Sequence, residues 1–290
     1  MTWIKLLWQR WSVWKMSLKN KEFKEGNLAV YVMTHGPECT WLDDYCIPME
    51  LGAAKRDNLR YTIRDDDGED NISEKNGLYN ELTGLYWMWK NDKHEFVGLY
   101  HYRRIFNLSR KEINNILKEK DAIVGIINHK KNIEDAYMRW HLKEDWNIFQ
   151  EELIRLYPQY EETSRKYFQQ EKIIVANMFI TKQEILQQYY QWIFPLLRNI
   201  EERLDLEIER TQYNKRAIGF IAERAFGLWI IQNNLDIAVK KVWKVPPYFL
   251  TEKCPKFIEK IITKNLYIHN FVIYLQDKVY SIIIRFKEKR

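Results

Sequence analysis

Short apolar runs that end in polar residues alternate with longer amphipathic segments along most of this chain. Such apolar runs predict buried strands, and the amphipathic segments predict the helices that cover them. Because strands that alternate with helices form a sheet between helical layers, the pattern predicts an α/β fold. The predicted strands cover residues 28–33, 96–100, 121–127, 173–180 and 239–245, and the predicted helices cover residues 78–90, 134–156, 182–205 and 216–233.

Polar and cationic residues follow two of the predicted strands. In open α/β sheets, ligands bind outside the carboxyl ends of the strands. An arginine side chain presents a rigid fork of donors that pairs bidentately with phosphate. The sequence therefore predicts a diphosphate site, and the alternative is a solvated basic loop after a strand. Thr34 and His35 follow the run 28–33, and His101, Tyr102, Arg103 and Arg104 follow the run 96–100.

Composition narrows the class of protein. Hydrophobic residues make up 46% of the 290 residues, which is enough for a large core. The three cysteines lack the spacing of a metal site, so we expect free thiols in a reducing compartment. No secretory signal and no apolar run long enough for a transmembrane helix is visible. We therefore expect a cytoplasmic protein.

The positive charge lies at the two ends of the chain. Residues 1–25 carry a net charge of +4 and residues 256–290 a net charge of +5, which leaves −3 for the middle of the chain. An acidic body argues against nucleic-acid binding. The basic ends favour attachment to an anionic membrane surface.

Residues 1–25 predict a basic amphipathic helix. Four tryptophans recur on one face at helical spacing, which is typical of a helix lying in a membrane interface. The alternative is a helix that packs on the protein's own core. Residues 251–290 form a second basic extension, with an apolar pattern too irregular to assign, and residues 26–250 form the predicted main domain. The four residues are Trp3, Trp8, Trp11 and Trp14.

The acidic triplet 65–67 has two interpretations. Carboxylate oxygens bind Mg²⁺ or Mn²⁺ together with substrate phosphates. However, the triplet precedes a glycine, which is an ordinary turn signal. We favour a solvated turn, and a requirement for Mn²⁺ or Mg²⁺ stays open.

Residues 134–156 carry a second pair of polar candidates. His141 and Asp145 stand at an i, i+4 spacing, which places them on one face of the predicted helix. The pair is a candidate for binding an acceptor substrate, and the alternative is a structural pair on a helix.

Several motifs together resemble a bacterial family of capsule and exopolysaccharide glycosyltransferases, long labelled a domain of unknown function. Some of its members are assigned as galactofuranosyltransferases or related hexosyltransferases. The resemblance spans residues 28–245, and both basic ends lie outside it. The motifs are residues 49–54, 68–76, 81–90, 98–106, 177–180 and 219–224.

The resemblance implies a GT-A-like fold that binds a nucleotide-diphosphate sugar. We expect a UDP-sugar as the donor, because the cationic strand end and the asparagine-rich loops suit a pyrophosphate and a sugar. It implies transfer of a hexose, with galactofuranose as one candidate, to a lipid-linked or growing polysaccharide acceptor. Capsule, exopolysaccharide or O-antigen synthesis would place the protein on the inner face of the bacterial cell membrane.

The charge that builds on the leaving diphosphate requires stabilisation. We expect Arg103 or Arg104 to replace or supplement a metal in that role. Glu223 is the candidate general base, and its alternative is an ion pair within its helix. Asn177 is expected to orient donor or acceptor. The expected contacts to the sugar or ribose hydroxyls come from Asp70, Asn71, Lys75 and Asn76.

A non-catalytic membrane-surface adaptor is the rival hypothesis. In that case the basic ends attach the protein to the membrane and the acidic body binds a partner. It predicts no nucleotide binding and tolerance of substitutions at Asn71 and Arg103.

Overall fold

The computed structural model describes residues 27–36, 38–39, 42–206, 210–211, 213–245 and parts of 267–275. The predicted amphipathic helix over residues 1–25 lies outside the described residues, as does most of the extension 251–290. No helix among the residues that the structure describes is long and apolar enough to span a membrane.

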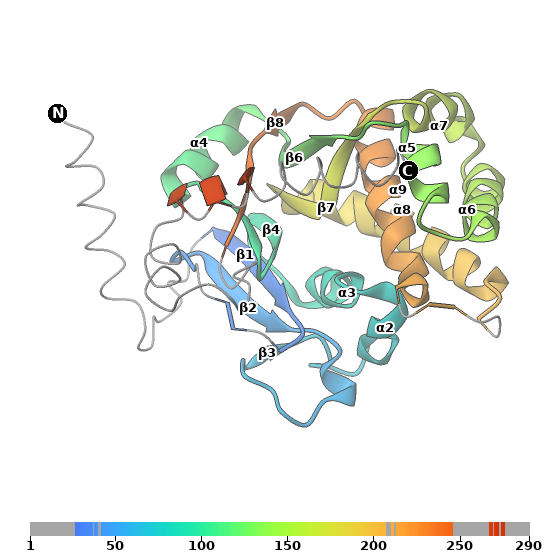
Figure 1. Ribbon diagram of the computed structural model, residues 1–290. Helices are drawn as coiled ribbons and strands as arrows, with labels where there is room; N and C mark the ends of the chain where they lie inside the picture. The colour runs from blue at the N-terminus through green and yellow to red at the C-terminus, as the bar shows by residue number, and fades with distance from the viewer. Residues whose placement is uncertain are drawn as a thin grey trace.

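A mixed sheet forms the centre of the described chain (Figure 1). The strands β1, β2, β3 and β4 run parallel, whereas β7 lies antiparallel to both β4 and β6. The carboxyl ends of β1, β2 and β4 therefore lie at one edge of the sheet. Because β7 is antiparallel to β4, the N-terminal part of β7 lies at the same edge. In sheet order the strands are β3 (Ile63–Arg64), β2 (Cys46–Glu50), β1 (Leu28–Thr34), β4 (Phe96–His101), β7 (Lys172–Lys182), β6 (Ala122–Asn128) and β8 (Ile237–Val239), while β5 (Arg104–Phe106) pairs with β4 and with β9 (Val242–Lys244).

Both faces of the sheet are covered. Alternate residues of β1 face opposite sides, since side chains alternate along a strand. Ala29 and Tyr31 join the larger core with most of the helices, whereas Leu28 and Val30 join a smaller core with α4. The helices are α2 (Asn76–Tyr79), α3 (Leu82–Asn91), α4 (Arg110–Glu119), α5 (Ile133–Met138), α6 (Lys143–Leu156), α7 (Glu161–Phe168), α8 (Gln183–Arg203) and α9 (Ala217–Gln232).

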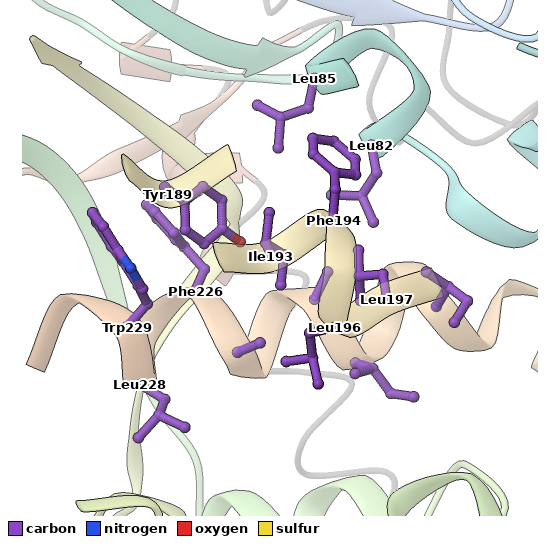
Figure 2. Close-up of a cluster of buried hydrophobic side chains, with 14 of the residues drawn as sticks. Leu82, Leu85, Tyr189, Ile193, Phe194, Leu196, Leu197, Phe226, Leu228 and Trp229 are labelled. Atoms are coloured by element: carbon purple, nitrogen blue, oxygen red, sulfur yellow. The ribbon is translucent and has the colours of Figure 1, made fainter. Parts of the chain in front are cut away.

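The helices α8 and α9 pack through a dense aromatic and aliphatic cluster (Figure 2). The ring of Tyr189 lies 5.1 Å from those of Phe226 and Trp229, centroid to centroid. Phe194, on the same helix as Tyr189, stacks on Trp89 of α3 at 5.4 Å. Each fully buried large apolar side chain contributes about 1.5–3 kcal/mol. This packing fixes α9 relative to α3 and the sheet.

The predicted α/β fold is confirmed, and the strand run 96–100 and the helix 182–205 fall close to β4 and α8. Two predicted helices are wrong in their continuity. The helix 78–90 breaks into α2 and α3 at Asn80, whose φ is 53°. The helix 134–156 is α5 and α6 with a turn between them.

Candidate active site

The polar residues after β1 and β4 meet at one edge of the sheet. Met33 of β1 pairs with His101 of β4, so the residues that follow them are neighbours. The ring of His35 lies edge-on to that of Tyr102 at 5.4 Å, and the guanidinium of Arg103 lies 4.7 Å from the same ring. The predicted meeting of these strand ends is confirmed.

This edge is strongly cationic. Burial lowers the pKa of His35, and the positive charges of Arg103, Arg56 and Arg216 lower it further. His35 is therefore neutral near pH 7, and the guanidinium groups supply the local charge. Arg56 is held by an ion pair of 2.7 Å with the fully buried Glu50 at the end of β2. Such an edge attracts an anionic ligand.

Asn177 stands at a break in the ladder between β6 and β7. The register shifts between the pairs 124–179 and 126–174, and Asn177 has a φ of 49°. Bulges of this kind re-aim a side chain next to functional sites. The buried amide of Asn177 donates through Nδ2 to Oε1 of Glu81 at 2.8 Å. Its Oδ1 is buried and has no hydrogen-bond partner among the described residues.

The carboxylate of Glu81, which binds this amide, lies near a second carboxylate, that of Glu223. Burial raises the pKa of Glu81, against the opposing effects of the Asn177 hydrogen bond and of Arg216 and Arg104. Burial also raises the pKa of Glu223, and the nearby charge of Glu81 raises it further. Two like charges at one site disfavour double ionisation, so a proton-accepting carboxylate can be tuned toward neutral pH.

Glu223 keeps contact with solvent, since its side chain is 26% exposed. It forms an ion pair of 2.9 Å with Arg224, so the alternative interpretation of an intrahelical pair is also observed. His101 and Arg104 favour its charged form from the sheet edge. Glu81, by contrast, is buried. Of the two carboxylates, Glu223 is the one a substrate can reach.

A glycine lets α9 pack closely against Asn80. A Cβ on Gly219 would lie 2.0 Å from Nδ2 of Asn80. The side chain of Asn80 accepts a hydrogen bond of 2.7 Å from Nε of Arg216, just before α9. The break between α2 and α3 is thus tied to the residue just before α9, the helix that carries Glu223.

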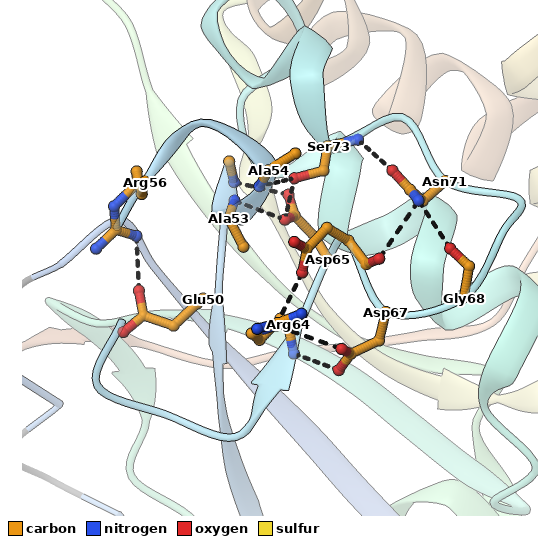
Figure 3. Close-up of polar contacts among 12 residues, drawn as sticks. Glu50, Ala53, Ala54, Arg56, Arg64, Asp65, Asp67, Gly68, Asn71 and Ser73 are labelled. Atoms are coloured by element: carbon orange, nitrogen blue, oxygen red, sulfur yellow. Dashed lines mark hydrogen bonds and ion pairs between the residues drawn. The ribbon is translucent and has the colours of Figure 1, made fainter. Parts of the chain in front are cut away.

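Asp65 organises the polar loop between β2 and α2 (Figure 3). Its fully buried carboxylate accepts hydrogen bonds from the backbone of Gly52 and Ala53 and from the hydroxyls of Ser73 and Thr83, at 2.5 to 3.0 Å. The expectation of a solvated turn is wrong for this residue, because a buried carboxylate needs such donors.

The same contacts argue against a metal on the acidic triplet. Both oxygens of Asp65 already accept two hydrogen bonds each. Asp66 and Asp67 both form ion pairs with Arg64. Among the described residues no group of three or more His, Cys, Asp or Glu is arranged to hold a metal ion. The triplet does not fit a Mg²⁺ or Mn²⁺ site.

The four polar residues expected to contact sugar or ribose hydroxyls make contacts of their own. Asp70 accepts from Tyr86 and pairs with Lys90, and these contacts lower its pKa. Asn71 bonds back to its own loop through Gly68. The expected role of Asp70, Asn71, Lys75 and Asn76 in donor binding stays a prediction. Lys75 pairs with Glu201 at 2.8 Å, and Asn76 donates to the carbonyl of Asn80 and to Thr83.

His141 and Asp145 do not form a pair on one helix. His141 lies in the turn between α5 and α6, and Asp145 lies in the first turn of α6. The buried carboxylate of Asp145 forms two hydrogen bonds, of 2.7 and 2.8 Å, with Arg210. The ring of His141 stacks on Tyr213 at 5.3 Å and lies 4.2 Å from Phe220. Asp145 is thus engaged in the fold, whereas the ring of His141 packs against Tyr213 and against Phe220 of α9. The expected role of both residues in acceptor binding stays a prediction.

Burial lowers the pKa of His141 to about 4, helped by the charge of Arg224. Because its folded pKa lies below its ordinary value of 6.5, protonation favours unfolding as the pH falls from 6.5 toward 4. His141→Phe keeps the aromatic contacts and removes this titration. We expect the melting temperature of the wild type to fall more steeply over that range than that of the variant. Parallel curves would contradict the burial of a neutral imidazole.

Three residues at the site were not predicted from the sequence. Arg56 and Arg216 join the cationic edge although neither follows a predicted strand. Glu81 gave a weak signal, because it is an acid at the start of an apolar helix. Its carboxylate meets Asn177 only through contacts between residues far apart in the chain.

The profile of a family described as a domain of unknown function (DUF4422) matches residues 29–234. The chain belongs to this family. The match to DUF4422 covers the strand ends, the Asn177 bulge and α9, and so contains every group of the site described above. No curated protein sequence matches the chain.

A solved structure supports the fold of this DUF4422 member. The apo structure of the bifunctional glycosyltransferase WbbM superposes with a TM-score of 0.69 at 25% sequence identity. The match covers 77% of this chain and 47% of that protein, so the chain spans about half the length of WbbM. The expected GT-A-like fold is confirmed for the described residues.

Proposed function

We propose that this DUF4422 protein is a glycosyltransferase that uses a nucleotide-diphosphate sugar. One observation carries the proposal: a solvent-accessible carboxylate with a raised pKa, Glu223, lies among cationic groups at the carboxyl edge of the sheet. Glycosyl transfer needs both parts, a base for the acceptor hydroxyl and positive charge for the leaving diphosphate. The likeness to WbbM supports the same class of reaction.

In the proposed reaction the acceptor hydroxyl oxygen forms a bond to the anomeric carbon. The bond between that carbon and the diphosphate oxygen breaks, and the nucleoside diphosphate leaves with the electron pair. Glu223 takes the proton of the hydroxyl. Arg103 and Arg104 stabilise the charge on the leaving group, and Asn177 holds the buried Glu81 by donating to its carboxylate. A displacement of this kind inverts the anomeric centre.

We propose that the arginines take the place of a divalent cation. Support comes from the donor set, since the acidic triplet is engaged with Arg64 and with the donors around Asp65. Arg104 lies on β5 and pairs with His101 in the β4–β5 ladder, so its backbone is fixed by the sheet. A preorganised charge of this kind needs no reorganisation during the reaction.

The finer assignments rest on the resemblance and the charge pattern. We propose a UDP-hexose as donor, with galactofuranose as one candidate sugar, and a lipid-linked or growing polysaccharide as acceptor. Synthesis of a surface polysaccharide at the inner face of the bacterial membrane suits the basic ends of the chain. The alternative of a non-catalytic adaptor predicts that no nucleotide sugar binds.

A thermal-shift screen of UDP-, GDP-, CMP- and dTDP-sugars, with and without Mn²⁺, tests the proposal. A ligand at 100 times its Kd stabilises the fold by about 2.7 kcal/mol. We expect a UDP-sugar to raise the melting temperature without metal, and Arg104→Ala to abolish most of that rise. Lys166→Ala, which removes only an exposed ion pair with Glu162, is the matched control. If no nucleotide sugar raises the melting temperature of the wild type, the result supports the adaptor hypothesis instead.

A further inference from the structure

The described part of the C-terminal extension carries an exposed apolar face. Residues 267–268, 270–272 and 274–275 are helical. Large apolar side chains recur there at the spacing of one helical face, and each is at least 41% exposed. A soluble helix ordinarily turns such a face toward a core. The residues are Tyr267, Ile268, Phe271, Tyr274 and Leu275.

This helical segment is anchored to the sheet through Asn270 and through a ring contact of Tyr267. The side-chain amide of Asn270 donates to the carbonyl of Lys244 at 2.7 Å and accepts from the backbone N–H of Lys244 at 2.9 Å. The ring of Tyr267 lies edge-on to that of Trp243 at 4.9 Å. Asn270 thus binds the backbone of β9 as a neighbouring strand would. The apolar face stays exposed although the segment is docked.

Cationic residues surround the anchor point. Lys240, Lys241 and Lys244 lie at and beside β9, and the ammonium of Lys241 is 4.4 Å from the centroid of the Trp243 ring. In the sequence, Lys264 and Lys278 flank the helical segment. Aromatic side chains with basic neighbours are typical of elements that lie in the interface of an anionic membrane.

We propose that residues 267–275 form a docking face for an anionic lipid surface. The apolar face enters the boundary between head groups and acyl chains, and the lysines contact the anionic head groups. The positive charge of these lysines favours an anionic lipid surface over a second copy of the chain as the binding partner, because two such basic regions would repel one another.

The anchor also links this face to the candidate site. Lys244 pairs with Arg104 in the ladder between β9 and β5, and the N–H of Val245 donates to the carbonyl of Arg103 at 3.0 Å. A lipid surface bound at residues 267–275 therefore holds a fixed orientation to the strand that carries Arg104. If the proposed function is correct, this arrangement suits an acceptor held in the membrane.

Flotation of the full chain with vesicles tests the docking face. We expect binding to vesicles of equal parts phosphatidylcholine and phosphatidylglycerol, and weaker binding to phosphatidylcholine alone. The double substitution F271S/Y274S is expected to lower partitioning at least about tenfold. Trp140→Ser, which replaces an aromatic residue that is 64% exposed elsewhere, is the control and is expected to leave partitioning unchanged.

The salt dependence of vesicle binding and the oligomeric state in solution distinguish lipid insertion from the alternatives. Salt screens the charged contacts but not the apolar ones. Apolar insertion is supported if the wild type keeps part of its vesicle binding at high salt and F271S/Y274S does not. Equal binding of wild type and double variant would overturn the proposal, as would absence of wild-type binding. Light scattering that finds a dimer of the wild type and a monomer of the variant would assign the face to a second copy instead. Unchanged melting temperature confirms that the variant is folded, and none of these readouts depends on transferase activity.

Discussion

Glu223→Gln is expected to lower kcat by about 10²–10⁴-fold, the range for loss of a general base. The amide keeps the size of the side chain and a hydrogen-bonding oxygen for Arg224 but cannot accept the proton of the acceptor hydroxyl. The KM for the nucleotide sugar is expected to change little, because the cationic strand ends still bind the diphosphate. Steady-state transfer rates with varied donor measure both quantities.

The pH dependence gives the same prediction a second readout. The pKa of Glu223 is raised from an ordinary value of 4.5 by burial and by Glu81, so the acidic limb of kcat is expected above that value. The limb should vanish in Glu223→Gln. Glu162→Gln, at an exposed residue of α7 paired with Lys166, is the matched control. A fully active Glu223→Gln would leave its ion pair with Arg224 as the sole role of this residue.

Asp65→Ala is expected to cost at least about 3 kcal/mol of unfolding free energy. The substitution leaves four donors without their acceptor, on Gly52, Ala53, Ser73 and Thr83, and each buried unpaired donor costs about 1–3 kcal/mol. These donors join the end of β2 to the loop and to α3, so the loss affects the support of the site as well. Chemical denaturation followed by circular dichroism measures the change.

Asp67→Ala is the matched control for Asp65. The two carboxylates belong to the same triplet, but the side chain of Asp67 is 40% exposed and pairs with Arg64 at 3.3 Å. Exposed ion pairs contribute about 0–1 kcal/mol. If both variants lose a comparable amount of unfolding free energy, the buried hydrogen bonds of Asp65 stabilise the fold no more than an exposed ion pair does.

The sequence alone determined the fold class and one half of the site. Apolar runs such as 28–33 and 96–100 had to be buried, and polar residues at their ends had to emerge at one edge of a parallel sheet. His35, Tyr102 and Arg103 could therefore be predicted as neighbours, and they are. A local pattern suffices there, because parallel strands bring their carboxyl ends together whatever the rest of the chain does.

Local pattern failed where a break in an element depended on a distant partner. Residues 134–156 have helical periodicity, yet the chain turns at His141, whose ring packs against Phe220 of α9. Asn80 interrupts another predicted helix with a positive φ of 53°, and its side chain is tied to Arg216. In each case a contact far along the chain outweighs the modest preference of a few residues for helix.

The other half of the site was decided by tertiary structure alone. Asp65 looked like part of a solvated turn, because nothing in its neighbourhood reveals that donors from Gly52 and Thr83 converge on it. The pKa of Glu223 is raised first by burial and further by Glu81, which lies far away in sequence. The close packing of α9 against Asn80 requires a glycine at residue 219. A sequence states which residues carry charge, but their pKa values depend on burial and on neighbouring charges, and both exist only once the chain has folded.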